Sequence, residues 1–235
     1  EAEAFLVATG SETTSPAVPG LNDTPFWTSD EVLELEGLPE SVITLGGGVV
    51  ACELAQFLAR VGTKVTLIQR SPHILKEFSE EASLCIEQAF RDEGIELFTD
   101  TQLEQVEDVD GGVSVRFQHE GSLVERKAAH LFNALGRKPA TEELGLDAAQ
   151  VELLPSGHLK TDAFQQTTNP RIYAAGDCAG PHEIVHVAIR QGETAASHAF
   201  GQTPNSLGYD ALLKVVFTDP QIAFVGLTED ELRDR

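Results

Sequence analysis

The sequence has few cysteines. Only three occur in its 235 residues, Cys52, Cys85 and Cys178, and no two of them are close in the chain. Cysteines spaced in this way form neither a disulfide framework nor a cysteine-based metal site, and they are typical of a protein kept in a reducing compartment. We therefore expect a cytoplasmic protein without a metal centre.

Basic residues are also scarce, and long hydrophobic runs are absent. Sixteen Lys and Arg stand against 38 Asp and Glu, which gives a formal net charge of −22. Such a charge repels nucleic acid and anionic membranes. The apolar runs, such as Ser41 to Leu45 and Lys64 to Ile68, have the length of strands, whereas a membrane-spanning helix needs roughly 20 apolar residues. We expect neither nucleic acid nor a membrane as a partner.

The middle of the sequence has the order strand, glycine turn, helix, strand. The apolar run Val42 to Leu45 predicts the first strand, Val49 to Val61 the helix, and Lys64 to Ile68 the second strand. This order predicts a βαβ unit with a right-handed crossover. A second helix is predicted from about Ser79 to Gly94. Short alternating runs between residues 95 and 135, broken by glycine turns, predict an antiparallel meander.

The glycine turn has the pattern G-x-G-x-x-A from Gly46 to Ala51. In a dinucleotide-binding turn the first glycine makes the tight bend, the second lets the backbone approach a pyrophosphate, and the small third residue allows close packing of the helix. The N–H groups at the start of the helix face the phosphates. We expect Gly46, Gly48, Val49 and Ala51 to bind a nicotinamide dinucleotide. The alternative is a tight turn without a ligand.

The residues after the second strand bear on which nicotinamide cofactor binds. An acidic residue there would accept a hydrogen bond from the ribose 2′-OH and repel a 2′-phosphate. The sequence instead has Gln69 and Arg70, followed by Lys76. A neutral residue and two cations suit a phosphate, so NADPH is favoured and NADH is the alternative. The alternative interpretation is that Arg70 and Lys76 are solvated surface charges.

Four motifs in a fixed order resemble those of the pyridine nucleotide–disulfide oxidoreductases. In chain order they are Ala8-Thr9-Gly10, the glycine turn with Glu53, Gly136-Arg137-Lys138-Pro139 and Ala174-Ala175-Gly176-Asp177. Within that family, the segment from Val215 to Gln221, with Trp27-Thr28-Ser29 and Gly176-Asp177-Cys178, is most similar to mercuric reductases, and dihydrolipoyl dehydrogenases are the next comparison. The resemblance covers essentially the whole chain.

The resemblance implies a role for several residues. Thr9, Gly10, Gly176 and Asp177 would bind FAD, with Asp177 holding a hydroxyl of the ribityl chain. Glu53 would approach the flavin beside the nicotinamide, as the one catalytic candidate. Its neighbours Val50, Leu54 and Phe57 look core-facing, which would place Glu53 near a pocket. Gly136 would lie near the nicotinamide, and Cys178 is expected to be a small buried residue.

The resemblance also implies an α/β fold in which a Rossmann-like NAD(P)H domain, a parallel sheet plus the meander, is inserted in an FAD domain of the same class. Residues 1–28 would end the first FAD segment, 29–135 form the NAD(P)H domain, 136–206 complete the FAD domain, and 207–235 begin a dimerisation domain. The first FAD glycine motif, the redox cysteine pair and the lysine partner of Glu53 would precede residue 1. The catalytic His and Glu of the dimerisation domain would follow residue 235.

The implied function is that of an FAD-dependent NAD(P)H oxidoreductase, homodimeric in its full-length form. Hydride would pass from NADPH to the flavin and on to a small-molecule substrate, either a thiol/disulfide or a metal ion held by thiols. The alternative is a nucleotide-binding module or fragment without turnover of its own. A third hypothesis is a redox-sensing protein that binds FAD but is not reduced by NADPH.

Overall fold

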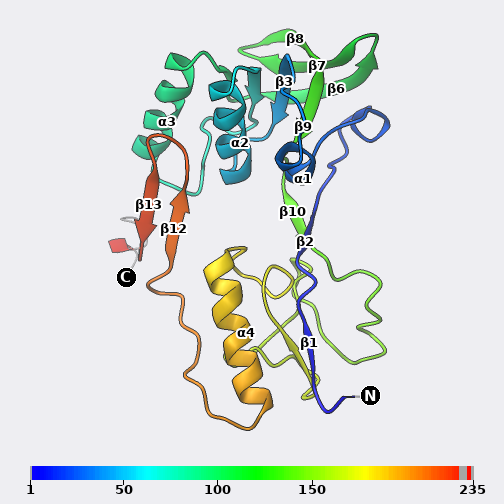
Figure 1. Ribbon diagram of the computed structural model, residues 1–235, viewed down its shortest axis with the longest axis vertical. Helices are drawn as coiled ribbons and strands as arrows, with labels where there is room; N and C mark the ends of the chain where they lie inside the picture. Colours follow the sequence, from blue (N-terminus) through cyan, green and yellow to red (C-terminus); the bar gives the residue numbers. More distant parts are fainter. Residues whose placement is uncertain (1, 228–231, 234–235) are drawn as a thin grey trace. The chain divides into compact units, whose positions relative to one another are not determined.

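In the computed structural model, which describes residues 2–227 and 232–233, the chain divides into two units (Figure 1). The larger unit comprises residues 13–136 and 212–235, and the smaller unit comprises residues 1–12 and 137–211. Each unit is therefore assembled from two stretches of chain that are distant in sequence.

A four-stranded parallel sheet forms the centre of the larger unit. Its spatial order is β5-β4-β3-β9. The strands are β3 (Ser41–Leu45), β4 (Lys64–Ile68), β5 (Glu96–Phe98) and β9 (His130–Asn133). The chain moves outward from β3 to β5 and then returns to the other side of β3 as β9, so the strand order reverses between β3 and β9. Open α/β sheets bind ligands beyond the carboxyl ends of the strands at such a reversal.

Two helices cover one face of this sheet. Helix α2 (Val49–Arg60) and helix α3 (Glu80–Asp92) contribute Leu58 and Phe90 to a core that also contains Val42 of β3. The Ser79 side chain caps α3 by accepting the Ala82 N–H at 3.3 Å. The short helix α1 (Ser29–Leu33) begins with a capping box formed by Thr28 and Glu31.

The antiparallel meander covers the other face. It consists of β6 (Gln102–Val109), β7 (Gly112–His119) and β8 (Ser122–Ala128). Val115 and Phe117 of β7 pack with Ile43 and Leu45, the residues of β3 that alternate with Val42. Because successive strand residues point to opposite faces, the sheet is buried on both sides. The predicted α/β class, with a parallel sheet and an antiparallel meander, is confirmed.

A hairpin from the end of the chain joins the larger unit. Strands β12 (Leu213–Val216) and β13 (Ile222–Val225) are antiparallel, and Val216 is fully buried in the core beneath α2. Gln56 of α2 donates to the Asp219 carbonyl at 2.8 Å and accepts the Asp219 N–H at 2.8 Å. The Gln56 side chain of α2 thus stabilises the turn of this hairpin through two hydrogen bonds.

The smaller unit contains short strands and one long helix. Strand β1 (Phe5–Val7) pairs in parallel with β11 (Ile172–Ala174), and β2 (Ser11–Thr13) pairs with β10 (Arg137–Pro139). Helix α4 (Val185–Ala199) follows β11.

A separate 3₁₀ turn, Leu21–Asp23, lies in the larger unit. In the part of the chain that the structure describes, no helix is both long enough and apolar enough to cross a membrane.

Candidate functional site

The glycine turn lies at the carboxyl end of β3, beside the strand reversal. Gly46 has a φ of 110°, and a Cβ added to it would lie 2.3 Å from the Ala134 carbonyl oxygen. The Ala134 N–H donates to the Leu45 carbonyl at 2.9 Å, so the chain leaving β9 runs directly against the turn. Only glycine fits at position 46, for both steric and conformational reasons.

Gly48 differs from Gly46 in having open space beside it. It is the N-cap of α2 with an ordinary φ of −77°, and no described heavy atom lies within 4 Å of an added Cβ. Within the described residues, no side chain caps this helix start. Ala51 is buried behind the turn at 1% exposure. Free helix N–H groups beside an open backbone surface fit an anionic group such as a pyrophosphate.

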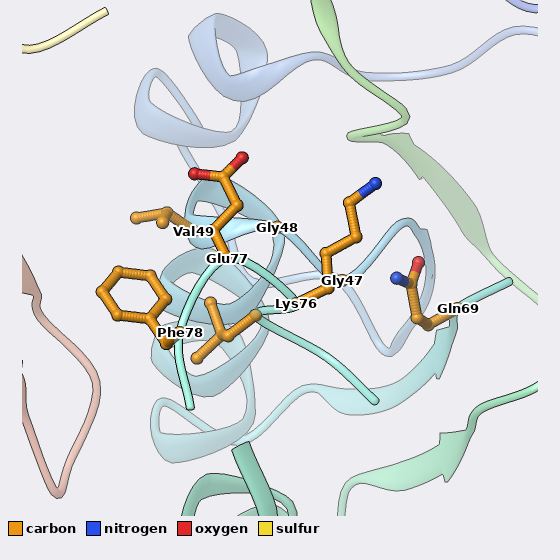
Figure 2. A pocket seen from close by; sticks show the side chains of 8 residues that line it. Gly47, Gly48, Val49, Gln69, Lys76, Glu77 and Phe78 are labelled. Atoms are coloured by element: carbon orange, nitrogen blue, oxygen red, sulfur yellow. The ribbon is translucent and has the colours of Figure 1, made fainter. Parts of the chain in front are cut away.

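A pocket lies in front of this turn (Figure 2). Gly47, Gly48 and Val49 form one wall, and Gln69 follows strand β4. The remaining wall is the loop from Leu75 to Phe78, and in Figure 2 the Lys76 side chain is drawn between those of Glu77 and Gln69. The structure therefore brings four of the predicted residues to one pocket, namely Gly48, Val49, Gln69 and Lys76.

The two cations predicted for a phosphate have different positions. Lys76 lines the pocket, whereas Arg70 is exposed and is not among the lining residues. Neither has an ion-pair partner within residues 2–227 and 232–233. Glu77, which the sequence interpretation passed over, places a carboxylate at the same pocket. The proximity of Glu77 to the motif residue Lys76 was the only signal for it.

The side chain of Glu53, a residue of α2, is held in place by the C-terminal hairpin. Its Oε1 atom accepts the Phe217 N–H at 2.8 Å. The expectation that Val50 and Phe57 face the core is wrong, because they are 41% and 49% exposed, and only Leu54 packs against the core. The apolar residues of α2 therefore cover more of the helix surface than its buried face does. That buried face carries Ala51, Cys52, Ala55 and Leu58.

Gly136 follows β9 at the boundary of the larger unit. It has a φ of 137°, and its carbonyl accepts the Thr14 N–H at 2.9 Å. It is exposed and does not line the pocket in front of the glycine turn. A role near a nicotinamide stays a prediction.

In the smaller unit, a second glycine turn follows β11. Gly176 has a φ of 79°, and Asp177 beside it is half-buried. The Ser11 hydroxyl donates to Asp177 Oδ2 at 2.7 Å, and Arg137 Nε donates to the Ser11 Oγ at 2.7 Å. Among the described residues, Asp177 Oδ1 has no hydrogen-bond partner. A carboxylate oxygen that is free in this way fits a ligand hydroxyl.

Thr9 and Gly10 lie between β1 and β2, directly before Ser11. The Thr9 hydroxyl donates to the Ala140 carbonyl at 2.7 Å, and the Gly10 carbonyl accepts the Ala140 N–H at 2.9 Å. Gly10 has a φ of 73°, and an added Cβ would meet no described atom within 4 Å. These two residues bind the segment after β10, and any contact with a cofactor stays a prediction.

Gln191 of α4 is a residue that the sequence interpretation missed. It is fully buried, and its Oε1 accepts the Gly176 N–H at 2.7 Å while its Nε2 donates to the Gly180 carbonyl at 2.7 Å. It thereby fixes the backbone on both sides of Asp177. A glutamine in the middle of a helix carries no sequence signal for this role.

The three cysteines have the separate positions that their spacing predicts. Cys52 and Cys178 are buried and Cys85 is exposed, and all three are free thiols. Burial raises the pKa of the Cys52 thiol well above its ordinary value, which disfavours the thiolate, the nucleophilic form of the side chain. Cys178 is buried in the core of the smaller unit, as expected. No group of three metal-ligating side chains occurs in the described ranges.

Comparison with known proteins agrees with these motifs. A family model described as pyridine nucleotide-disulphide oxidoreductase matches residues 1–192. The chain is 41% identical over 234 residues to a mercuric reductase of Streptomyces lividans, covering 100% of this chain and 49% of that protein. It is 39% identical over 235 residues to a mercuric reductase of Bacillus cereus, covering 100% and 37%. With a dihydrolipoyl dehydrogenase of Thermus scotoductus it shares 36% over 239 residues, covering 99% and 50%.

Solved structures give the same result for the fold. The HOCl-induced flavoprotein disulfide reductase RclA of Escherichia coli superposes with a TM-score of 0.88 at 26% identity, covering 99% of this chain and 53% of that one. LpdA of Mycobacterium tuberculosis gives 0.86 at 30% identity, covering 99% and 50%. The chain spans half or less of the length of the curated relatives named above. By the family match over most of its length, the chain belongs to the pyridine nucleotide-disulphide oxidoreductases.

Proposed function

We propose that this chain forms the nucleotide-binding part of an FAD-dependent NAD(P)H oxidoreductase of the disulfide reductase type. When bound, the nicotinamide supplies a hydride, and the flavin passes the electrons on to a thiol/disulfide or a metal ion held by thiols. The names of the relatives, mercuric reductase and dihydrolipoyl dehydrogenase, support this reaction class. The residues of this chain bind and orient the two cofactors.

The observation that carries the proposal is the open backbone at Gly48. The start of α2 offers N–H groups to a phosphate, and the absence of a Cβ lets that phosphate approach. Gly46 and Ala51 maintain the turn, one against the Ala134 carbonyl and the other behind the helix start. Val49 completes this wall of the pocket. We assign the pyrophosphate of NADPH to this position.

Lys76 supports NADPH over NADH. The residue after β4 is the neutral Gln69, and the Lys76 ammonium, which has no ion-pair partner among the residues that the structure describes, is at the same pocket. A lysine there favours the additional phosphate of NADPH. The Glu77 carboxylate opposes this preference, and the exposed Arg70 adds to it from outside the pocket wall. The expected preference is therefore moderate, and NADH is the alternative cofactor.

The smaller unit is proposed to bind FAD. Asp177 would accept a ribityl hydroxyl at its free Oδ1, with Thr9, Gly10 and Gly176 shaping the backbone around it. Helix α4 begins at Val185, and its N-terminal dipole would stabilise the reduced, anionic flavin. Glu53 and Gly136 would face the nicotinamide. The segments 1–28, 29–135, 136–206 and 207–235 remain the proposed domain boundaries.

We further propose a cytoplasmic homodimer in the full-length form, acting on a small molecule. The high negative charge supports the absence of nucleic acid or an anionic membrane as a partner. A second candidate function is a nucleotide-binding module without turnover. It is favoured by the fact that the described residues of this chain include no redox-active cysteine pair, because Cys52, Cys85 and Cys178 lie apart.

The test is a calorimetric titration of the chain with NADPH and with NADH. We expect tighter binding of NADPH, and a loss of about tenfold in NADPH affinity for Lys76→Ala, since one charge-assisted hydrogen bond contributes about that factor. Arg70→Ala should lose less because Arg70 lies outside the pocket wall. Lys64→Ala is the matched control, as this exposed lysine lies at the start of β4, away from the turn.

An absorbance scan separates the two functions. Bound flavin that NADPH reduces supports the oxidoreductase and excludes a module without turnover. Binding of neither nucleotide by a folded chain would contradict the proposed pyrophosphate site.

A further inference from the structure

The loop from His73 to Phe78, which carries Lys76, is folded against the glycine turn. The Leu75 N–H donates to the Gly47 carbonyl at 2.7 Å. Leu75 has a φ of 50°, a left-handed conformation that costs free energy for a branched side chain. The loop therefore does not adopt this shape from its own preference. Contacts from elsewhere have to hold it.

A buried carboxylate on α3 provides those contacts. The Glu87 side chain is only 4% exposed. Its Oε1 accepts the Ile74 N–H at 3.2 Å and lies 3.2 Å from His73 Nδ1, and its Oε2 accepts from Arg91 Nη2 at 3.4 Å. Removing a carboxylate from water is costly unless hydrogen bonds and opposite charges replace the water. These two loop residues and Arg91 supply that replacement.

Two other glutamates of α3, Glu80 and Glu81, differ from Glu87 in their exposure and in their hydrogen bonds. Glu80, from the first turn of α3, lies 3.6 Å from His73 Nε2 but is 71% exposed. Glu81 is also exposed, and among the described residues it is Glu87, not Glu80 or Glu81, that accepts a hydrogen bond from the loop backbone. Glu87 is thus the carboxylate that binds both a loop side chain and a loop N–H. Glu87 does not line the pocket, so any effect of Glu87 on a bound nucleotide has to act through the loop.

We infer that Glu87 is a positioning residue for Lys76 and that it sets the preference of the pocket for a 2′-phosphorylated nucleotide. Three consecutive loop residues connect Glu87 to the pocket. Glu87 accepts the Ile74 N–H, and the Leu75 N–H donates to the Gly47 carbonyl. Lys76, the next residue, then lies at the pocket beside Gln69 (Figure 2). This inference rests on the proposed binding of a nicotinamide dinucleotide at the glycine turn.

The first experiment measures the dissociation constants of NADPH and NADH for the 235-residue chain and its variants. We expect Glu87→Ala to weaken NADPH binding by about tenfold and NADH binding by about twofold, because the contribution of one charge-assisted hydrogen bond at Lys76 is lost. Glu87→Gln retains an acceptor for the Ile74 N–H and should fall in between. Glu81→Ala on the same helix should change neither constant.

The second experiment asks whether Glu87 acts through Lys76. In a Lys76→Ala background, Glu87→Ala should leave the NADPH-to-NADH affinity ratio unchanged, since the group that it positions is gone. A general loss of stability would lower both affinities together and would leave the ratio intact in either background. The ratio therefore distinguishes positioning from folding, and urea unfolding of each variant measures the folding separately.

The outcomes separate the two proposals. If the unaltered chain is folded and binds neither nucleotide, the proposed function fails and this inference fails with it. If the chain binds NADPH more tightly than NADH and Glu87→Ala and Glu87→Gln both leave the ratio unchanged, only the inference is overturned. An equal drop in the ratio with and without Lys76 overturns it as well.

Discussion

The two glycine turns of the molecule, at Gly46 to Gly48 and at Gly176 to Asp177, follow short parallel strands but are built differently. At the first, the helix starts directly after the turn, and Gly48 has open space beside it. At the second, the Gly176 N–H is already bonded to Gln191, and Asp177 already accepts a hydrogen bond from Ser11.

The difference lies in where the supporting residues come from. The strand, the three glycines and the adjoining helix of the first turn are contiguous in the sequence, and Ala134 and the Leu75 N–H contact this turn from farther along the chain. The second depends on Ser11, 166 residues away in the sequence, and on a glutamine two turns into α4. Both turns carry a motif, but the residues that support the second turn, Ser11 and Gln191, cannot be found from that motif because they are distant from it in the sequence.

The largest expected effect comes from Gly46→Ala. Its Cβ would lie 2.3 Å from the Ala134 carbonyl at a φ of 110°. We expect a loss of about 3 kcal/mol in the free energy of unfolding, because the clash is with backbone. Urea unfolding followed by the fluorescence of Trp27 measures it, since this single tryptophan lies in the larger unit.

Gly48→Ala is the matched variant for that measurement. Open space and an ordinary φ should limit its loss of stability to less than about 1 kcal/mol, while NADPH binding falls because the methyl group meets the phosphate. A Gly48→Ala variant as unstable as Gly46→Ala would show that the two glycines do not differ in the way described.

The next effect is expected in the second turn. Gln191→Ala would leave the Gly176 N–H and the Gly180 carbonyl without their partner. Two backbone groups left unbonded in a buried position should cost about 2 kcal/mol of unfolding free energy. Both tyrosines, Tyr173 and Tyr209, lie in the smaller unit, so near-UV circular dichroism of tyrosine reports its unfolding.

Glu193→Ala serves as the control for Gln191, as Glu193 is exposed on the same helix and forms an ion pair with Arg190 three residues earlier. An equal loss of stability in both variants would mean that the buried amide contributes nothing beyond helix propensity. That result would remove the contrast between the two turns.

The smallest effect concerns an ion pair between the parallel sheet and the meander. Arg126 of β8 lies within 2.7 Å of Glu96 of β5, and its guanidinium is 4.8 Å from the centre of the Phe98 ring. Hydrogen bonds from Arg126, and then from Thr66, lower the pKa of Glu96 below its ordinary value of 4.5. Both side chains are more than a third exposed, so Arg126→Ala should cost only about 0.5 kcal/mol at neutral pH.

The sign of the pH dependence follows from the lowered pKa. The stabilisation by Glu96 is fully present above its unfolded pKa of about 4.5 and is lost as the pH falls through the lower folded value. The difference in unfolding free energy between the original chain and Arg126→Ala should therefore shrink below pH 4.5. Lys64→Ala is the control, because this lysine lies 3.9 Å from Glu40 and both side chains are almost fully exposed. A difference that grows on acidification would contradict this account.

Much of the larger unit was predictable because its signals are local. The apolar run of β3, the glycine turn with α2 and the periodicity of α3 each depend on neighbouring residues, and all three were placed within about two residues. The burial of α2 was less predictable. Val50 and Phe57 are apolar and yet exposed, because side-chain hydrophobicity does not specify which stripe of a helix meets a sheet.

The sequence by itself determined the fold class, the glycine turn and the family to which the chain belongs, since contiguous residues encode strands, turns and the start of a helix. The tertiary structure alone decided that Lys76 lines the pocket and Arg70 does not, that Glu87 fastens the loop carrying Lys76, and that Gln191 and Ser11 support Asp177. The physical reason is that burial and hydrogen bonding join residues distant in the chain, and their pairing depends on how the elements pack.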